Sequence, residues 1–204
     1  FVAGIVDNTC VRLESQRASS APNTSERERQ PENRKQERSR TAALAPDIRT
    51  TAAADRDAIV QLVRATGFFR EEEIGVACEV LDDALRDGPA GHYQSLCATL
   101  DGRPVGWVCY GPTPCTVGTF DVYWLAVDPA CQGHGLGRAL MCAAEDGMQA
   151  RNAALVVVET SGSDHYDGTR RFYQRQGYLE VARVPDFYAP GDDRVMYTKR
   201  LETA

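Results

Sequence analysis

The sequence predicts an α/β (α+β) fold, in which helices flank both sides of a mixed, mostly antiparallel sheet of about seven strands. Short runs rich in β-branched and apolar residues alternate with segments whose apolar residues recur at helical spacing. Turn-forming pairs such as Asp101-Gly102 and Asp128-Pro129 separate these runs. The apolar share of 43% and the charged share of 25% are typical of a globular domain.

The first 46 residues are expected to form a disordered, mildly basic arm. Residues 14–40 contain no Val, Ile, Leu, Met or aromatic residue, so they cannot bury enough apolar surface to offset the entropy of ordering. Residues 1–46 carry a net charge of +2, whereas the other 158 carry −8 of the chain's total of −6. Interleaved glutamates favour a solvated tether over an arm that binds nucleic acid. The folded domain is therefore expected over residues 47–204.

The first half of this domain begins with a predicted short strand at residues 47–50. Ile59, Val60 and Val63 at helical spacing predict a helix over 55–66, and a similar pattern predicts a second helix over 71–87 that ends at Gly88. Asp101-Gly102 predicts a hairpin between two strands. These strands are expected at residues 93–100 and 105–110.

The second half opens with the β-forming run TFDVYWLAV, which predicts a strand over 119–127. Apolar residues from Leu136 to Met148 indicate a helix over 136–150, and the β-branched run that follows predicts a buried strand over 155–159. A helix ending before Gly177 and two further strands complete the order βααβββαβαββ. These last elements are expected at residues 169–175, 178–184 and 194–200.

Several classes of protein are excluded or disfavoured. No apolar stretch approaches the roughly 18 residues needed to cross a bilayer, and the start lacks the basic region and apolar core of a secretory signal. We therefore expect a cytoplasmic protein that binds no membrane. The net negative charge disfavours nucleic-acid binding by bulk charge. Seven cysteines without a CxxC pair, and three scattered histidines, indicate reduced thiols and no metal site.

A glycine-rich turn lies between a predicted strand and a predicted helix. It reads Gln132-Gly133-His134-Gly135-Leu136-Gly137-Arg138. Alternating glycines remove the β-carbons that would hold a ligand away from the backbone, and helix N-terminal amides attract anions. The turn therefore predicts a pyrophosphate site. Its spacing fits neither a Rossmann fingerprint nor a P-loop. A tight turn with glycines for helix packing would explain one or two of the three.

The pattern Gln132-x-x-Gly135-x-Gly137 resembles the acyl-CoA-binding motif of the GNAT superfamily of N-acyltransferases. Phe172-Tyr173-x-x-x-Gly177-Tyr178 is similar to that superfamily's second signature. The order of elements matches too, so the resemblance covers roughly residues 47–201. It implies acetyl-CoA as co-substrate and no metal.

The resemblance also implies roles for individual residues. Leu125, Ala126 and Val127 would contact the pantetheine arm through their backbones. Tyr173 would lie beside the CoA sulfur as the general acid, although an aromatic ring packed between helix and sheet is the alternative. The pyrophosphate would be held by the turn, that is by Gln132, Gly133, His134, Gly135, Leu136, Gly137 and Arg138.

Acyl transfer also needs a base to take the proton of the amine. Glu159 ends a buried strand, where burial raises the pKa of a carboxylate, and Asp121 on the neighbouring strand is the second candidate. Many relatives have Asn where this chain has Tyr166, which leaves the base open. Cys109 or Cys131 as a nucleophile is a less favoured alternative to direct attack.

The acceptor is expected to be a cationic amine, because the folded part is acidic. Phe187-Tyr188-Ala189-Pro190 is similar to a Tyr-Tyr-Pro segment in the superfamily's branch that acetylates protein N-termini, although a simple turn explains it as well. Tyr188, Asp192 and Tyr166 are the candidate acceptor-binding residues. We expect acetylation of a protein or peptide amine by a monomer or homodimer. The alternatives are a small amine (antibiotic, polyamine or amino acid) and a non-catalytic acyl-CoA sensor.

Overall fold

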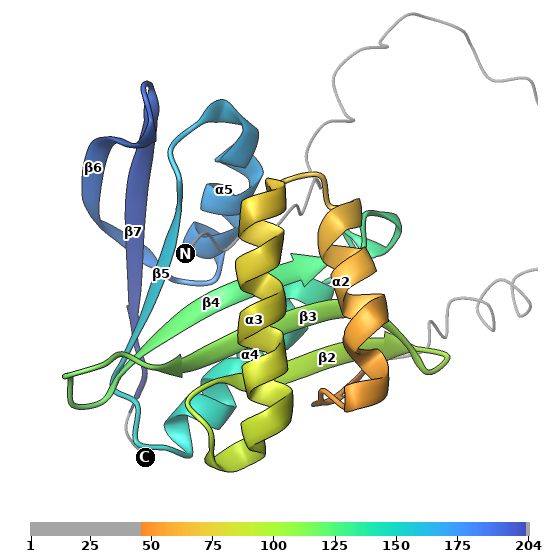
Figure 1. The fold of residues 1–204 in the computed structure, drawn as a ribbon. Helices are drawn as coiled ribbons and strands as arrows, with labels where there is room; N and C mark the ends of the chain where they lie inside the picture. Colours follow the sequence, from red (N-terminus) through yellow and green to blue (C-terminus); the bar gives the residue numbers. More distant parts are fainter. Residues whose placement is uncertain (1–45, 203–204) are drawn as a thin grey trace, which may run out of the picture. The chain divides into compact units, whose positions relative to one another are not determined.

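A computed structural model of the chain describes residues 46–202, so the arm predicted for residues 1–46 lies outside this part except for Pro46. The order of helices and strands is βααβββαβαββ, as predicted (Figure 1). The strands are β1 (Asp47–Thr50), β2 (Gln94–Leu100), β3 (Arg103–Pro112), β4 (Thr119–Val127), β5 (Leu155–Ser161), β6 (Leu179–Ala189) and β7 (Asp192–Arg200). The helices are α2 (Arg56–Ala65), α3 (Glu71–Asp87), α4 (Leu136–Gln149) and α5 (Asp167–Arg175).

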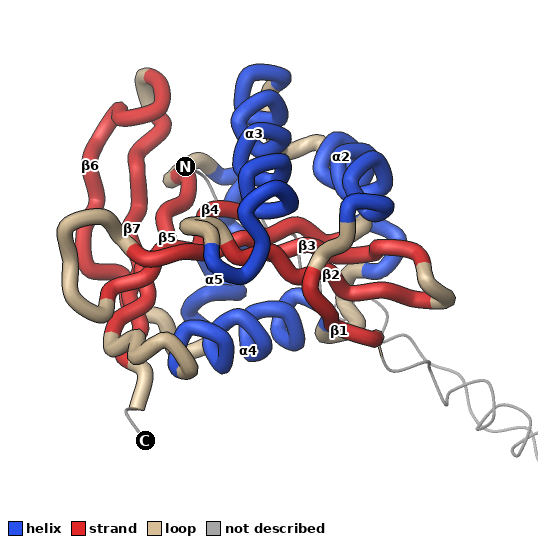
Figure 2. Tube along the Cα trace, turned by 60° about the horizontal axis from the view of Figure 1, so that its bottom comes forward, coloured by secondary structure: helices blue, strands red, loops and turns tan. Residues whose placement is uncertain are grey.

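The seven strands form one sheet in the order β1-β2-β3-β4-β5-β7-β6. Neighbouring strands are antiparallel except β4 and β5, which are parallel. Helices α2 and α3 cover one face and α4 the other (Figure 2). Each face has its own core, since Trp107 and Trp124 pack with α2 and α3, while Leu125 and Val158 pack with α4 and α5.

β4 and β5 diverge halfway along their length. They pair only from Thr119 with Leu155 to Val122 with Val158. Immediately afterwards β4 carries a bulge, because Val122 pairs with Tyr110 and Trp124 with Cys109, which leaves Tyr123 as an extra residue. A bulge bends its strand and increases the local twist. β4 then continues beside β3, and β5 continues beside β7.

The β6–β7 hairpin is longer than the sequence predicted. The segment 186–193 was expected to be a loop, but most of it belongs to the two strands, and Ala189 pairs with Asp192 across a turn at Pro190 and Gly191. β6 is the edge strand of the sheet. Pro185 is tolerated there because an edge strand needs no amide hydrogen bond on its outer side.

Residues 46–202 include no helix long and apolar enough to cross a membrane. The cysteines in this range are all free thiols, among them the buried Cys97 and Cys109. Burial raises the pKa of Cys97 to about 11. It also raises the pKa of Cys109, so both stay protonated at neutral pH.

Candidate active site

The glycine-rich turn connects the end of β4 to the start of α4. Gln132 fastens it to the strand, because its side-chain Nε2 donates a hydrogen bond to the Val127 carbonyl oxygen at 3.1 Å. Gly133 and Gly135 both have φ of 80°, a left-handed conformation that suits glycine. Gly135 is the N-cap of α4. The turn therefore brings the first amides of α4 directly beyond the end of β4.

This helix start has room for an anionic ligand. A β-carbon built on Gly135 meets no atom within 4 Å, and Gly133, His134 and Gly135 are exposed. The first N–H groups of a helix have no acceptor within the helix, and they carry its partial positive charge. Leu136 is buried and anchors the helix in the core, while Arg138 is exposed. The backbone here can therefore accept an anionic group.

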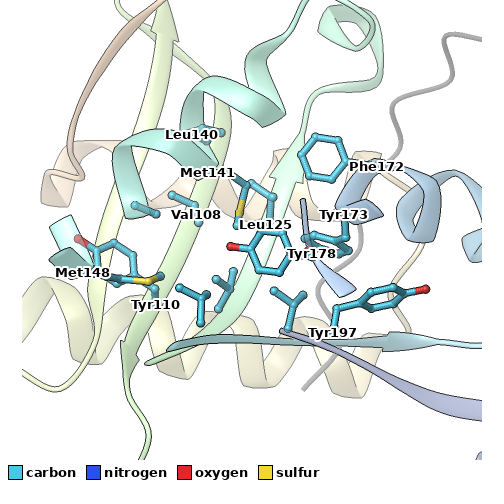
Figure 3. Close-up of a cluster of buried hydrophobic side chains, with 14 of the residues drawn as sticks. Val108, Tyr110, Leu125, Leu140, Met141, Met148, Phe172, Tyr173, Tyr178 and Tyr197 are labelled. Atoms are coloured by element: carbon cyan, nitrogen blue, oxygen red, sulfur yellow. The ribbon is translucent and has the colours of Figure 1, made fainter. Parts of the chain in front are cut away.

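Tyr173 on α5 is fully buried, and within residues 46–202 its hydroxyl has no hydrogen-bond partner. Its ring contacts those of Phe172, Tyr178 and Tyr197 at centroid distances of 5.4 to 6.2 Å (Figure 3). Tyr178 donates to Glu145 at 2.8 Å and Tyr197 to Glu180 at 3.2 Å. Among the tyrosines of this cluster, Tyr173 thus differs from Tyr178 and Tyr197 in having a hydroxyl without a partner in the described residues, whereas buried polar groups are normally paired.

Burial raises the pKa of Tyr173, so the phenol keeps its proton at neutral pH. The hydroxyl can therefore donate a proton or a hydrogen bond but does not act as an anionic base. The ring also packs in the core, so the two interpretations of this residue from the sequence are compatible. One part of the side chain fills space, and its hydroxyl is available for chemistry.

Glu159 and Asp121 lie on the other face of the sheet. Val158 and Val122 belong to the core under α4, and successive residues of a strand point to opposite faces. Glu159 accepts a hydrogen bond from Nη2 of Arg194 at 2.5 Å. Burial raises the pKa of Glu159, and the Arg194 guanidinium partly offsets this.

The second carboxylate, that of Asp121, accepts a hydrogen bond from the Thr113 hydroxyl at 2.7 Å. Burial raises the pKa of Asp121 as well, and the Thr113 hydrogen bond opposes the rise. Both carboxylates are therefore more basic than exposed ones.

The predicted acceptor-binding residues gather on the same side as Glu159. The Tyr188 hydroxyl is buried and, in the described part of the chain, has no partner; burial, reinforced by Glu159, Asp192 and Glu73, raises its pKa to about 12. Asp192 accepts a hydrogen bond from the Ser161 hydroxyl at 2.5 Å. Three carboxylates, one each from β5, β7 and α3, therefore lie near the Tyr188 hydroxyl.

Tyr166, the third predicted acceptor-binding residue, is buried. Its hydroxyl donates to the Phe68 carbonyl oxygen at 3.0 Å, and its ring meets that of Phe68 edge-on. The His165 ring stacks on the Phe68 ring, with 4.1 Å between the ring centroids. Tyr166 thus fastens the entry to α5 to the loop between α2 and α3, and its hydroxyl is already engaged.

Residues 56–178 match the model of the Acetyltransferase (GNAT) family. The chain belongs to the GNAT acetyltransferase family. An uncharacterized N-acetyltransferase of Methanocaldococcus jannaschii is 31% identical over 113 residues, which are 52% of this chain and 66% of that relative. A GNAT-family protein from Desulfovibrio desulfuricans is 42% identical, with a TM-score of 0.73 over 78% of this chain and all of the other.

The GNAT fold predicted from the sequence is therefore confirmed. An aminoglycoside 6′-N-acetyltransferase complexed with coenzyme A shares the fold at 18% identity, with a TM-score of 0.62 over 76% of this chain and 96% of the other. Within residues 46–202, no group of three or more His, Cys, Asp or Glu residues is arranged to hold a metal ion.

Sequence reasoning did not single out three side chains that lie near the candidate residues. Arg194 pairs with Glu159, Phe68 stacks with His165, and His92 lies 2.9 Å from the Tyr123 hydroxyl. These contacts join elements that are distant in the sequence, and their register is not readable from spacing. The one available signal was Arg194 itself, a charged residue at the start of a predicted inner strand.

Proposed function

We propose that this GNAT protein transfers an acetyl group from acetyl-CoA to a primary amine by direct attack of the amine on the thioester. The observation that carries the proposal is the arrangement around the divergence of β4 and β5. The glycine-rich turn begins at the end of β4, the unpartnered hydroxyl of Tyr173 lies under one face, and Glu159 lies on the other. This arrangement matches a reaction that needs a bound thioester, an acid and a base.

Acetyl-CoA supplies the acyl group already activated as a thioester. The backbones of Leu125, Ala126 and Val127 are the candidates for holding its pantetheine arm, and the amides of residues 132–138 for holding its pyrophosphate. Both assignments rest on the divergence of β4 from β5 and on the open space beside Gly135.

Two proton transfers remain for the side chains. Glu159, or Asp121 through water, takes a proton from the ammonium so that the nitrogen lone pair can attack. Tyr173 donates its proton to the sulfur that leaves, because burial keeps the phenol protonated until then. On becoming the amide, the ammonium loses two protons. The base passes the first to solvent, and the second, lost from the nitrogen after attack, replaces the proton that Tyr173 gives to the thiolate, which leaves as free CoA.

The acceptor class is part of the proposal. A protein or peptide amine is favoured by the hairpin tip, where Phe187 and Tyr188 place two rings 5.0 Å apart near the Glu159 carboxylate. A small-molecule amine is the second candidate, because the Arg194–Glu159 pair suits a compact charged ligand. Cytoplasmic location and the monomeric or dimeric state stay predictions.

Release of CoA from acetyl-CoA over a panel of amines tests this function. The panel contains short peptides with free N-termini, peptides with an internal lysine and a blocked N-terminus, amino acids, polyamines and an aminoglycoside. CoA is separated chromatographically, because the protein's own thiols would react with a thiol reagent. Turnover of at least one class is expected. Tight binding of acetyl-CoA without turnover of any amine would instead establish a sensor.

A further inference from the structure

Arg194 is a positively charged residue among the carboxylates on the side of the sheet where Glu159 lies. It lies on β7 opposite Ser161 of β5. Besides its bond to Glu159, its guanidinium lies 4.8 Å from the centre of the Phe187 ring, and Nη2 approaches the Met196 sulfur at 3.6 Å. These contacts orient a side chain that is 26% exposed. The guanidinium is therefore fixed in place and partly dehydrated.

Most of the hydrogen-bonding capacity of Arg194 is unused. Nη2 is the nitrogen that has protein partners, whereas Nε is buried and has none within residues 46–202. Arg183 on β6 behaves differently, because Nε and Nη2 donate to Glu180 and Nη1 to Asp193. A buried N–H without an acceptor is destabilising. The Nε of Arg194 therefore lacks the oxygen acceptor that the Nε of Arg183 has in Glu180.

A second unpartnered polar atom belongs to the same group. The Tyr188 hydroxyl is buried and without a partner in the described chain, and Glu159 and Arg194 are both close enough to act on its pKa. A phenol hydroxyl and the N–H groups of a guanidinium can both donate hydrogen bonds to a carboxylate. The planar guanidinium of arginine matches the two carboxylate oxygens better than the ammonium of lysine does. Holding Glu159 alone would not require this planar group.

We propose that the acceptor carries a carboxylate a few bonds from its reactive amine, and that Arg194 and Tyr188 bind this carboxylate while Glu159 receives the amine. The inference rests on the proposed acetyl transfer. The Glu159–Arg194 ion pair is complementary to a zwitterion, since each member of the pair meets the opposite charge. A polyamine would instead bring a second cation towards Arg194, which like-charge repulsion disfavours.

Two sources supply this chemistry. One is a free amino acid, through its α-carboxylate, and the other is a peptide whose first residue is Asp or Glu, through its side chain. Matched pairs separate them: phenylalanine against phenylalaninamide, and the peptide Glu-Ala-Ala-amide against Gln-Ala-Ala-amide. The peptide pair differs mainly in the carboxylate charge. Phenylalaninamide also has a less basic amine than phenylalanine, so the binding measurement decides for that pair. The pair with the larger difference identifies the source.

The experiment measures kcat and KM for both pairs with the full chain, and also the binding of the same compounds to the protein with CoA by calorimetry. The carboxylate member of at least one pair is expected to have a kcat/KM roughly 10- to 100-fold higher, mainly through KM, as charge-assisted hydrogen bonds imply. Arg194→Gln should remove this preference, and the readout is the ratio of kcat/KM within each pair, because the loss of the Glu159 partner affects both members alike. Arg194→Lys should restore part of the preference.

Arg183→Gln is the matched control, because Arg183 is an arginine of the same hairpin with all its carboxylate partners in place. It should leave the preference intact. Equal kcat/KM and equal binding within both pairs would overturn the inference while the proposed acetyl transfer stands. Carboxylate-selective binding without turnover would support the inference and overturn the transfer.

Discussion

Tyr173 and Glu159 lie on opposite faces of the sheet, beside the point where β4 and β5 diverge. Tyr173 packs in the core with Val158, the last residue of β5 that pairs with β4. Glu159 follows Val158 in the strand, points to the other face and accepts a hydrogen bond from Arg194. A thioester lying between the two strands would have the proton donor on one side and the base on the other.

Tyr173→Phe should lower kcat by roughly 10²- to 10⁴-fold, because the general acid is lost. Binding of CoA should change little, since the substitution leaves the ring and the glycine-rich turn intact. Stability should stay within about 0.5 kcal/mol of the parent or rise, because the removed hydroxyl has no partner in the described structure. Steady-state kinetics, calorimetry with CoA and urea unfolding measure the three effects.

Tyr178→Phe is the control for this prediction. Tyr178 lies in the same cluster, but its hydroxyl donates to the buried Glu145. We expect the opposite result: a loss of about 2 kcal/mol of stability and a nearly unchanged kcat. If both variants lost activity alike, packing in the cluster would explain the effect and Tyr173 would lose its role as the acid.

Gly135→Glu should weaken acetyl-CoA binding by roughly 100-fold or more. The new carboxylate would occupy the open space at the start of α4 and repel the pyrophosphate. The protein should still fold, because no atom obstructs the side chain, with a cost of about 1 kcal/mol for a left-handed conformation in a residue other than glycine. Calorimetry with CoA and circular dichroism check both points.

Gly102→Glu provides the matched control. Gly102 also has a positive φ, of 77°, and open space, but it lies in the β2–β3 turn. The backbone cost should be similar and the affinity for CoA unchanged. Equal affinities in the two variants would mean that the glycine-rich turn does not hold the pyrophosphate.

Local sequence signals predicted most of the fold. The run 119–127 and the helix 71–87 have the predicted bounds, since the first is rich in β-formers and the second ends at Gly88. The length of the β6–β7 hairpin was underestimated because proline and glycine, here Pro185 and Gly191, are typical of loops. Only pairing with β7 shows that residues 186–189 continue a strand. Edge strands tolerate such residues, so local propensity underestimates their length.

The part of the candidate site that is formed by the backbone could be predicted from the sequence. The glycine-rich turn is a contiguous motif, so its position at the start of α4 followed from the sequence. The Arg194–Glu159 pair joins β7 to β5 and depends on the register of two strands, which spacing does not give. The bulge at Tyr123, where β4 diverges from β5, leaves no distinctive pattern in the residues themselves.

The pH dependence of kcat/KM should distinguish the two candidate bases. A base acts only when deprotonated, so activity falls as the pH drops through its pKa. Burial raises the pKa of Glu159 above 4.5 and that of Asp121 above 3.8, so the acidic limb should lie above these ordinary values. Glu159→Gln should abolish this limb and most of the activity. Asp121→Asn should leave the limb in place, and the reverse pattern would identify Asp121 as the base.

Asp55→Asn should destabilise the fold by about 2 kcal/mol. Asp55 is buried, binds Arg49 through two hydrogen bonds of 2.6 and 2.9 Å, and accepts the Ala52 amide at 2.8 Å. The substitution removes the charge and leaves Arg49 without its partner. As the control, Asp82→Asn breaks an exposed pair with Arg56 and should cost less than about 1 kcal/mol.

The effect of Asp55 should also depend on pH with a definite sign. The hydrogen bonds from Arg49, more than any other cause, lower the pKa of Asp55 below 3.8 in the folded protein. The folded state therefore binds fewer protons than the unfolded state, and the contribution is complete above the unfolded pKa. It is lost as the pH falls below 3.8 through the lower folded value. Urea unfolding of the parent and of Asp55→Asn should give a constant difference from pH 5 to pH 7, which are roughly one or more units above that pKa, and a shrinking one below pH 3.8. A difference that grows on acidification would show that Asp55 is not held as a stabilising carboxylate.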